Sequence, residues 1–180
     1  MATKTIGPPR LVKPDAANRE VIDDSYRVLN GQTWSAGDFL FLDASGLLKK
    51  CADDQDAALG GIKFFALEDQ SDPGNSTTKG GAVIPITREM EFEVNVHHGT
   101  AASALAAAGI VGLQYNMIYV DPDGTTSGDH VVLDLSNVSN PAFDVTAIAS
   151  DYASENNTVA DVYGLCRVKI TSANLDATPA

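Results

Sequence analysis

Cysteine is nearly absent from this chain. Its 180 residues include only Cys51 and Cys166. A disulfide framework needs more cysteines than this, and a zinc knuckle needs closely spaced ones. Both residues lie in segments where apolar positions alternate. We therefore expect two small buried thiols, not joined by a disulfide, in a protein made in a reducing compartment.

Basic residues are scarce and unevenly placed. The chain has 12 Lys and Arg against 24 Asp and Glu, for a net charge of −12, and no Lys or Arg lies between Arg88 and Arg167. Binding through nucleic-acid phosphates requires a basic surface, so we expect no nucleic-acid partner. The acidic stretch predicts a negative surface, which is either simply solvated or a docking face for a basic partner.

The sequence also lacks a long apolar run. Its longest stretch without Asp, Glu, Lys or Arg, from Val94 to Val120, contains two histidines and several glycines, and its middle is mostly alanine. A membrane-spanning helix needs about 20 strongly apolar residues, so we expect no membrane partner. Residues 1–25 contain no apolar segment typical of a secretory signal, so a leader peptide is not expected.

Signatures of catalysis are missing as well. The sequence has no G-x-S-x-G, P-loop, H-E-x-x-H or C-x-x-C motif. Ser127, Asp129 and His130 fall within four residues, whereas a catalytic triad is assembled across a fold. The residues therefore do not support catalysis, and we expect a protein that is not an enzyme.

Two patterns invite a metal-site interpretation, and both are weak. Glu93 and His97 would share a strand face, but a metal ion would need a third ligand from elsewhere, and same-face polar residues usually form the solvent side of a strand. The acidic loop 121–129 departs from the calcium-binding loop of an EF-hand at Thr126 and Val132. It is therefore either a solvated turn or an irregular calcium loop that uses Asp121, Asp123 and Asp129, and the solvated turn is favoured. We expect no bound metal.

What the sequence does contain is enough apolar material for a folded core. Val, Ile, Leu and Phe number 44 of 180 residues, above the level at which chains stay unfolded. These residues fall in short runs separated by turn sequences such as Asn30-Gly31 and Asp43–Gly46. Roughly nine short strands with turns every 8–12 residues predict an all-β fold, a barrel or a sandwich.

Several segments allow more specific predictions. In Glu89–His98, alternation places Met90, Phe92, Val94 and Val96 on a core face and the glutamates on the solvent face. Pro85 marks a neighbouring strand as an edge or a bulge. The segment Thr100–Ala108 is either one short helix or an alanine-rich loop.

The two ends of the chain differ from its middle. Residues 1–25 carry three prolines and no sustained apolar period, which predicts an extended arm with little to pack against by itself, or a disordered terminus. Residues 26–171 form the predicted β-barrel domain. Residues 172–180 are polar and predict a loose tail.

The segment from Tyr26 to Glu68 resembles small head-decoration, or cement, proteins of tailed bacteriophages. The likeness rests on a G-D-x-L-x-L-D strand at Gly37–Asp43, a short turn at Ala44–Gly46, and a polar stretch before a further strand at Gly61–Leu67. Val83–Val94 and Gly112–Met117 resemble later elements, so about two-thirds of the chain takes part.

This resemblance implies a compact β-barrel or "β-tulip" domain with an extended N-terminal arm. It also implies a structural protein of the virion that has no catalytic residue and no cofactor and is assembled in the host cytoplasm. Such a protein binds the outer capsid surface and bridges neighbouring major capsid proteins, often as a trimer. The expected capsid-contact residues of the arm are Ile6, Arg10, Leu11, Val12 and Lys13. The candidate trimer interface consists of Leu40, Leu42 and Phe65, which alternation would leave outside the barrel.

Other functions remain open on the sequence alone. A carbohydrate-binding or adhesion module is the main alternative, because β-barrels with polar loops commonly carry such sites. Such a site would use exposed aromatic side chains. Against it, aromatics make up only 7% of the residues and Trp34 is the sole tryptophan, so the candidates are Tyr115, Tyr119, Tyr152 and Tyr163. A small-molecule hydrolase of unrecognised type is the third possibility.

Overall fold

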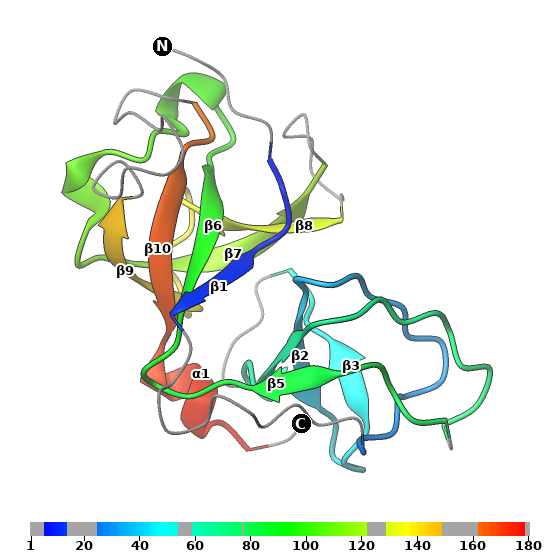
Figure 1. The fold of residues 1–180 in the computed structure, drawn as a ribbon. Coiled ribbons are helices and arrows are strands. Elements are labelled where there is room, and N and C mark those ends of the chain that lie inside the picture. Colours follow the sequence, from blue (N-terminus) through cyan, green and yellow to red (C-terminus); the bar gives the residue numbers. More distant parts are fainter. Residues whose placement is uncertain are drawn as a thin grey trace.

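The computed structural model describes residues 6–13, 25–53, 59–76, 78–121, 129–148 and 162–178. These residues form two β-sheets, a few short helical turns and connecting loops (Figure 1). The strands are β1 (Arg10–Lys13), β2 (Phe39–Leu42), β3 (Leu48–Lys50), β4 (Phe64–Ala66), β5 (Val83–Pro85), β6 (Glu91–His97), β7 (Gln114–Val120), β8 (His130–Asp134), β9 (Phe143–Ile148) and β10 (Leu165–Ile170). Among these residues, no helix is long and apolar enough to cross a membrane.

The larger sheet closes into a five-stranded barrel. The sheet itself has six strands in the order β1-β6-β10-β9-β7-β8. An additional pairing between β6 and β8 closes strands β6, β10, β9, β7 and β8 into the barrel, and β1 pairs with β6 beside it. That pairing is parallel and aligns Val96 with Leu133 and His97 with Asp134. The all-β barrel expected from the sequence is therefore confirmed.

The barrel interior follows the alternation of its strands. Met90, Phe92, Val94 and Val96 are all buried in one core cluster, as predicted. On β10, Cys166 and Val168 point into the same cluster. Because side chains alternate between the two faces of a strand, one row fills the barrel and the other lies on its outside.

The smaller sheet has the order β3-β2-β4-β5. The predicted hairpin between β2 and β3 is confirmed, and the Asp43 carboxylate accepts backbone hydrogen bonds from Ser45 and Leu47, both at 2.9 Å. Gly46 has a φ of 74°, a conformation that glycine adopts without steric cost. Pro85 lies on β5, an edge strand, as the sequence predicted.

The two sheets share one hydrophobic core. Phe39 of β2 contacts Phe92 of β6 and Phe143 of β9, with ring centroids 5.1 and 5.6 Å apart. Phe65 of β4 also contacts Phe92, at 5.0 Å. The second sheet therefore packs one face on the barrel, and aromatic side chains from both parts meet in the shared core.

The opposite face of the second sheet is buried too. Leu40, Leu48 and Phe64 form a separate cluster with Val28 and Trp34. Residues 26–34, predicted in part as a strand, instead make only isolated bridges, such as Val28 with Leu48. This segment covers the sheet face that would otherwise meet water.

The structure decides one open alternative about a helix and corrects the prediction for the C-terminal tail. The segment Thr100–Ala108 contains no α-helix: it holds a single 3-10 turn at Ala101–Ser103, and another begins at its end (Ala108–Ile110), so the loop alternative is correct. The predicted loose tail includes a short helix, α1 (Ser172–Asp176). Asn174 in α1 is buried and donates from Nδ2 to the Pro141 carbonyl oxygen at 3.0 Å, which anchors this segment.

Candidate functional site

Residues 6–13 form an extended segment on the outside of the barrel, called here the N-terminal strap. Its first anchor is Ile6, whose side chain is only 1% exposed and packs in a cluster with Val120, Val132 and Tyr163. Next to it, the Gly7 N–H donates to the Asn95 side-chain oxygen at 3.1 Å. The strap thus covers apolar side chains on the outer faces of β7 and β8.

Ion pairs hold the second half of the strap, strand β1, on strand β6. Arg10 lies 2.7 Å from Glu93, and Lys13 lies 3.2 Å from Glu91. From the other side, Arg167 of β10 lies 3.5 Å from Glu93. The face of β6 that the sequence assigned to solvent is therefore flanked by cations on both neighbouring strands, which balances its carboxylates.

The strap also reaches the second sheet. Gly37, in the turn before β2, has a φ of 99°, and a Cβ atom there would lie 2.9 Å from Pro8 Cβ and 3.0 Å from the Pro9 carbonyl oxygen. Only glycine fits such a close approach in that backbone conformation. The strap therefore contacts both parts of the molecule, and Figure 1 shows β1 alongside β6 above the second sheet.

These contacts correct the prediction of an extended arm that lies outside the β domain and has little to pack against by itself. Within the described residues, the strap belongs to the β domain, so the boundary at residue 25 is wrong for this segment; residues 14–24 lie outside the described part. Ile6 is not accessible for a capsid contact. Arg10 and Lys13 remain about half exposed, at 50% and 53%, while Leu11 and Val12 are partly buried. The sequence alone does not show that the glutamates of β6 lie opposite the basic residues of β1, because the two strands are far apart in the chain.

The candidate trimer residues are placed differently from the prediction. Leu40 is 0% exposed and Phe65 is 5% exposed, so neither lies outside the fold. Leu42 is partly buried against the same cluster as Leu40. Alternation correctly separates the two faces of β2, but both faces are covered, one by the barrel and the other by residues 26–34.

The residues considered for chemistry are engaged in structural contacts. Glu93 lies between two arginines, and His97 is buried and stacks on Tyr163 with ring centroids 6.0 Å apart. Asp129 and His130 lie at the start of β8, whereas Ser127 falls outside the described residues. Across the described ranges, no three His, Cys, Asp or Glu side chains gather in a way that could hold a metal ion.

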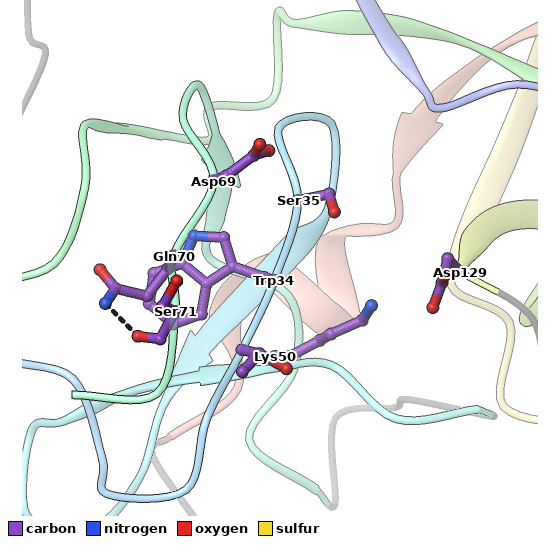
Figure 2. Close-up of a pocket in the computed structure, with 8 residues that line it drawn as sticks. Trp34, Ser35, Lys50, Asp69, Gln70, Ser71 and Asp129 are labelled. Atoms are coloured by element: carbon purple, nitrogen blue, oxygen red, sulfur yellow. Dashed lines mark hydrogen bonds between the residues drawn. The ribbon is translucent and has the colours of Figure 1, made fainter. Parts of the chain in front are cut away.

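A shallow polar pocket of about 320 Å³ lies between the second sheet and the barrel (Figure 2). It is lined by Thr33, Trp34, Ser35, Lys50, Asp69, Gln70, Ser71 and Asp129. All but Asp129 belong to the second-sheet part of the chain, and Figure 2 shows the Lys50 side chain extending toward Asp129 of the barrel. The pocket thus marks the rim of the contact between the two parts.

Lys50 is the central charge beside this pocket. Its ammonium group lies 2.9 Å from Asp38 and 4.3 Å from the centre of the Tyr119 ring. Burial raises the pKa of Asp38 above its ordinary value, although the Ser35 N–H and Lys50 act in the opposite direction. Because Lys50 pairs with an acid of one sheet and an aromatic ring of the other, it links the two parts.

The aromatic side chains expected of a carbohydrate site are not offered to solvent. Trp34 lines the pocket but is only 4% exposed, and Tyr115, Tyr119 and Tyr163 are buried as well. Sugar binding by aromatic stacking needs an exposed ring face. None of these four rings therefore presents an exposed face for stacking. Tyr152 lies outside the described part of the chain.

The two thiols give a prediction about reactivity. Both cysteines are buried, as expected, and burial raises the pKa of each thiol well above its ordinary value. The thiolate is the reactive form, so neither cysteine should react with a chromogenic disulfide reagent near pH 8 in the folded protein. Both cysteines should react once the protein is unfolded in the absence of reductant. Fast reaction of either thiol in the folded state would contradict the burial, and a count of zero after unfolding would indicate a disulfide.

Comparisons with known proteins add no identification. No family model, no curated protein and no solved structure matches this chain.

Proposed function

We propose that this chain is a structural capsid decoration protein, which binds the outer surface of a phage head and bridges neighbouring major capsid proteins. Its place is the virion, and it acts without catalysis or a cofactor. In the assembled particle it associates with itself as a trimer, a symmetry that three-fold positions on a capsid would match.

The observation that carries this proposal is the N-terminal strap. The resemblance implies an extended N-terminal segment, and residues 6–13 are extended on the barrel surface. We propose that the exposed side of this segment takes part in docking. Among the described strands, β1 pairs with β6 alone. Pro8, Arg10 and Lys13 of the strap are exposed and Val12 is partly exposed, so these side chains could contact a partner.

The shared core supports a bridging role. A protein that links two capsid subunits must resist being pulled apart between its two contacts. Here the barrel and the second sheet are joined by Phe39, Phe65 and Phe92, and the strap contacts both. We therefore expect the barrel and the second sheet to behave as one rigid unit rather than as two domains joined by a flexible linker.

The test mixes the purified protein with undecorated heads of the phage that encodes it. We expect saturable co-sedimentation at a fixed ratio to the major capsid protein, and native mass spectrometry of the released protein should show trimers. The double variant Val12→Ala/Lys13→Ala should bind at least tenfold more weakly, a loss of about 1.4 kcal/mol. Its fold should be retained, because exposed ion pairs contribute only about 0–1 kcal/mol.

A matched control is Lys79→Ala, which removes an exposed cation from the second-sheet part of the chain. This variant should bind heads like the unchanged protein. Failure of the unchanged protein to co-sediment would refute the proposed function. Equal binding by the strap variant and the control would instead show that docking uses another surface, and monomers alone would refute the trimer.

A further inference from the structure

Residues 29–32 form a tight turn that contains the pair Asn30-Gly31, and the backbone N–H of each of these two residues donates to a side-chain oxygen. The Gln32 N–H donates to the Leu29 carbonyl oxygen at 3.3 Å, and Gly31 has a φ of 81°. Asn30 is exposed. This arrangement matches a type II turn, in which the third residue is glycine because only glycine adopts that φ without strain.

An Asn-Gly pair can modify itself. The backbone nitrogen of the glycine attacks the side-chain carbonyl carbon of the asparagine, the bond to the amide nitrogen breaks, and ammonia leaves as the glycine nitrogen loses its proton. Water then opens the resulting five-membered imide to aspartate or isoaspartate. The step needs no oxidant, reductant or cofactor, and glycine favours it because no side chain hinders the attack.

We propose that Asn30 is a site of this self-modification, and that Asp72 suppresses it in the folded protein. The Gly31 N–H, which supplies the attacking nitrogen, donates to Asp72 Oδ1 at 2.9 Å. The same oxygen accepts the Gly74 N–H at 2.9 Å. The nucleophile is therefore bound to a carboxylate instead of being directed at the Asn30 side chain.

The charge of Asp72 works in the same direction. The two backbone hydrogen bonds lower the pKa of Asp72, so it is a carboxylate at neutral pH. A carboxylate at hydrogen-bond distance disfavours loss of the Gly31 amide proton, because the resulting nitrogen anion would face a second negative charge. Attack requires that loss, so the carboxylate slows the reaction electrostatically as well as by geometry.

A second side chain also holds the turn, and modification of the turn would disturb the buried residues on either side of it. The Asn30 N–H donates to Ser76 Oγ at 3.0 Å. The turn follows Val28 and precedes Trp34, two buried residues that cover the outer face of the second sheet. Conversion at Asn30 adds a negative charge beside Asp72, and isoaspartate lengthens the backbone, so both products would loosen this cover.

The test follows conversion at Asn30 over time by peptide mass spectrometry, using the tryptic peptide from Val28 to Lys49, in which Asn30 is the one asparagine. The folded protein should convert about tenfold more slowly than the same synthetic peptide, the scale expected for a hydrogen bond to a charged group. Asp72→Ala should raise the rate in the folded protein toward that of the peptide. Asp72→Asn keeps an acceptor without the charge and should give an intermediate rate.

The matched control is Asp43→Ala, which removes another carboxylate that accepts two backbone hydrogen bonds in a turn. It should leave conversion at Asn30 unchanged. Asn140 serves as an internal reference that should not convert by this route. It precedes Pro141, whose nitrogen carries no proton and cannot attack the asparagine side chain. Conversion of the unchanged protein at the peptide's rate, or an unaltered rate in Asp72→Ala that is confirmed as folded by circular dichroism, would overturn the proposal.

Discussion

Replacing Phe39 with alanine is expected to lower the free energy of unfolding by about 3–5 kcal/mol, the usual cost of deleting a buried aromatic side chain. Phe39 is completely buried and its ring contacts the rings of Phe65, Phe92 and Phe143. Alanine would leave a cavity where the second sheet meets the barrel. The loss should therefore weaken the connection between the two parts as well as the core.

Urea unfolding followed by two probes measures both effects. Trp34 is the sole tryptophan and lies in the second-sheet cluster, so its fluorescence reports on that part, whereas far-ultraviolet circular dichroism reports on all strands. The unchanged protein should give coincident transitions, as expected for one cooperative unit. Leu59→Ala is the control, because Leu59 is an exposed apolar residue, and its effect should be small. A small loss in Phe39→Ala would contradict a core shared by the two sheets.

Replacing Gly61 with alanine should cost nearly as much, about 3 kcal/mol from backbone strain and steric overlap together. Gly61 has a φ of 70°, and an added Cβ would lie 2.0 Å from the Asn174 carbonyl oxygen and 2.8 Å from Ala177 Cβ. Since backbone atoms cannot move aside as a flexible side chain can, helix α1 must shift. We expect a lower melting temperature and loss of hydrogen-exchange protection at Ile62, whose N–H donates to that carbonyl.

Gly46→Ala is the matched control for Gly61→Ala. Gly46 has nearly the same φ, 74°, but an added Cβ would have no atom within 4 Å. This variant pays only the left-handed strain, about 1–2 kcal/mol. The difference between the two variants therefore isolates the contact with α1. Equal losses would contradict the close packing of Gly61 on Asn174.

Local features of the sequence were sufficient to predict most of the strands. Asp43 and Gly46 define a turn through short-range hydrogen bonds and a left-handed backbone, so the hairpin between β2 and β3 follows from neighbouring residues alone. Alternation identified the core face of β6, because the period of two is a property of the strand itself. Pro85 marked an edge strand, since it lacks a backbone N–H for a second partner.

The same patterns could not show what covers a second face. Leu40 was expected outside the barrel, and Glu93 was expected in water; both are buried, one beneath Val28 and Trp34 and the other between Arg10 and Arg167. Alternation separates two faces but carries no information on which remote segment lies over each.

The sequence by itself thus determined that the chain is all-β, where most strands and turns lie, and that its two thiols are buried. Tertiary structure decided three further features: the parallel closure of β6 on β8, the placement of the strap across both sheets, and the anchoring of α1. Each of these depends on contacts between segments far apart in the chain. Such contacts arise from complementary shape and charge that appear only when the strands are assembled, so no local period or turn signal encodes them.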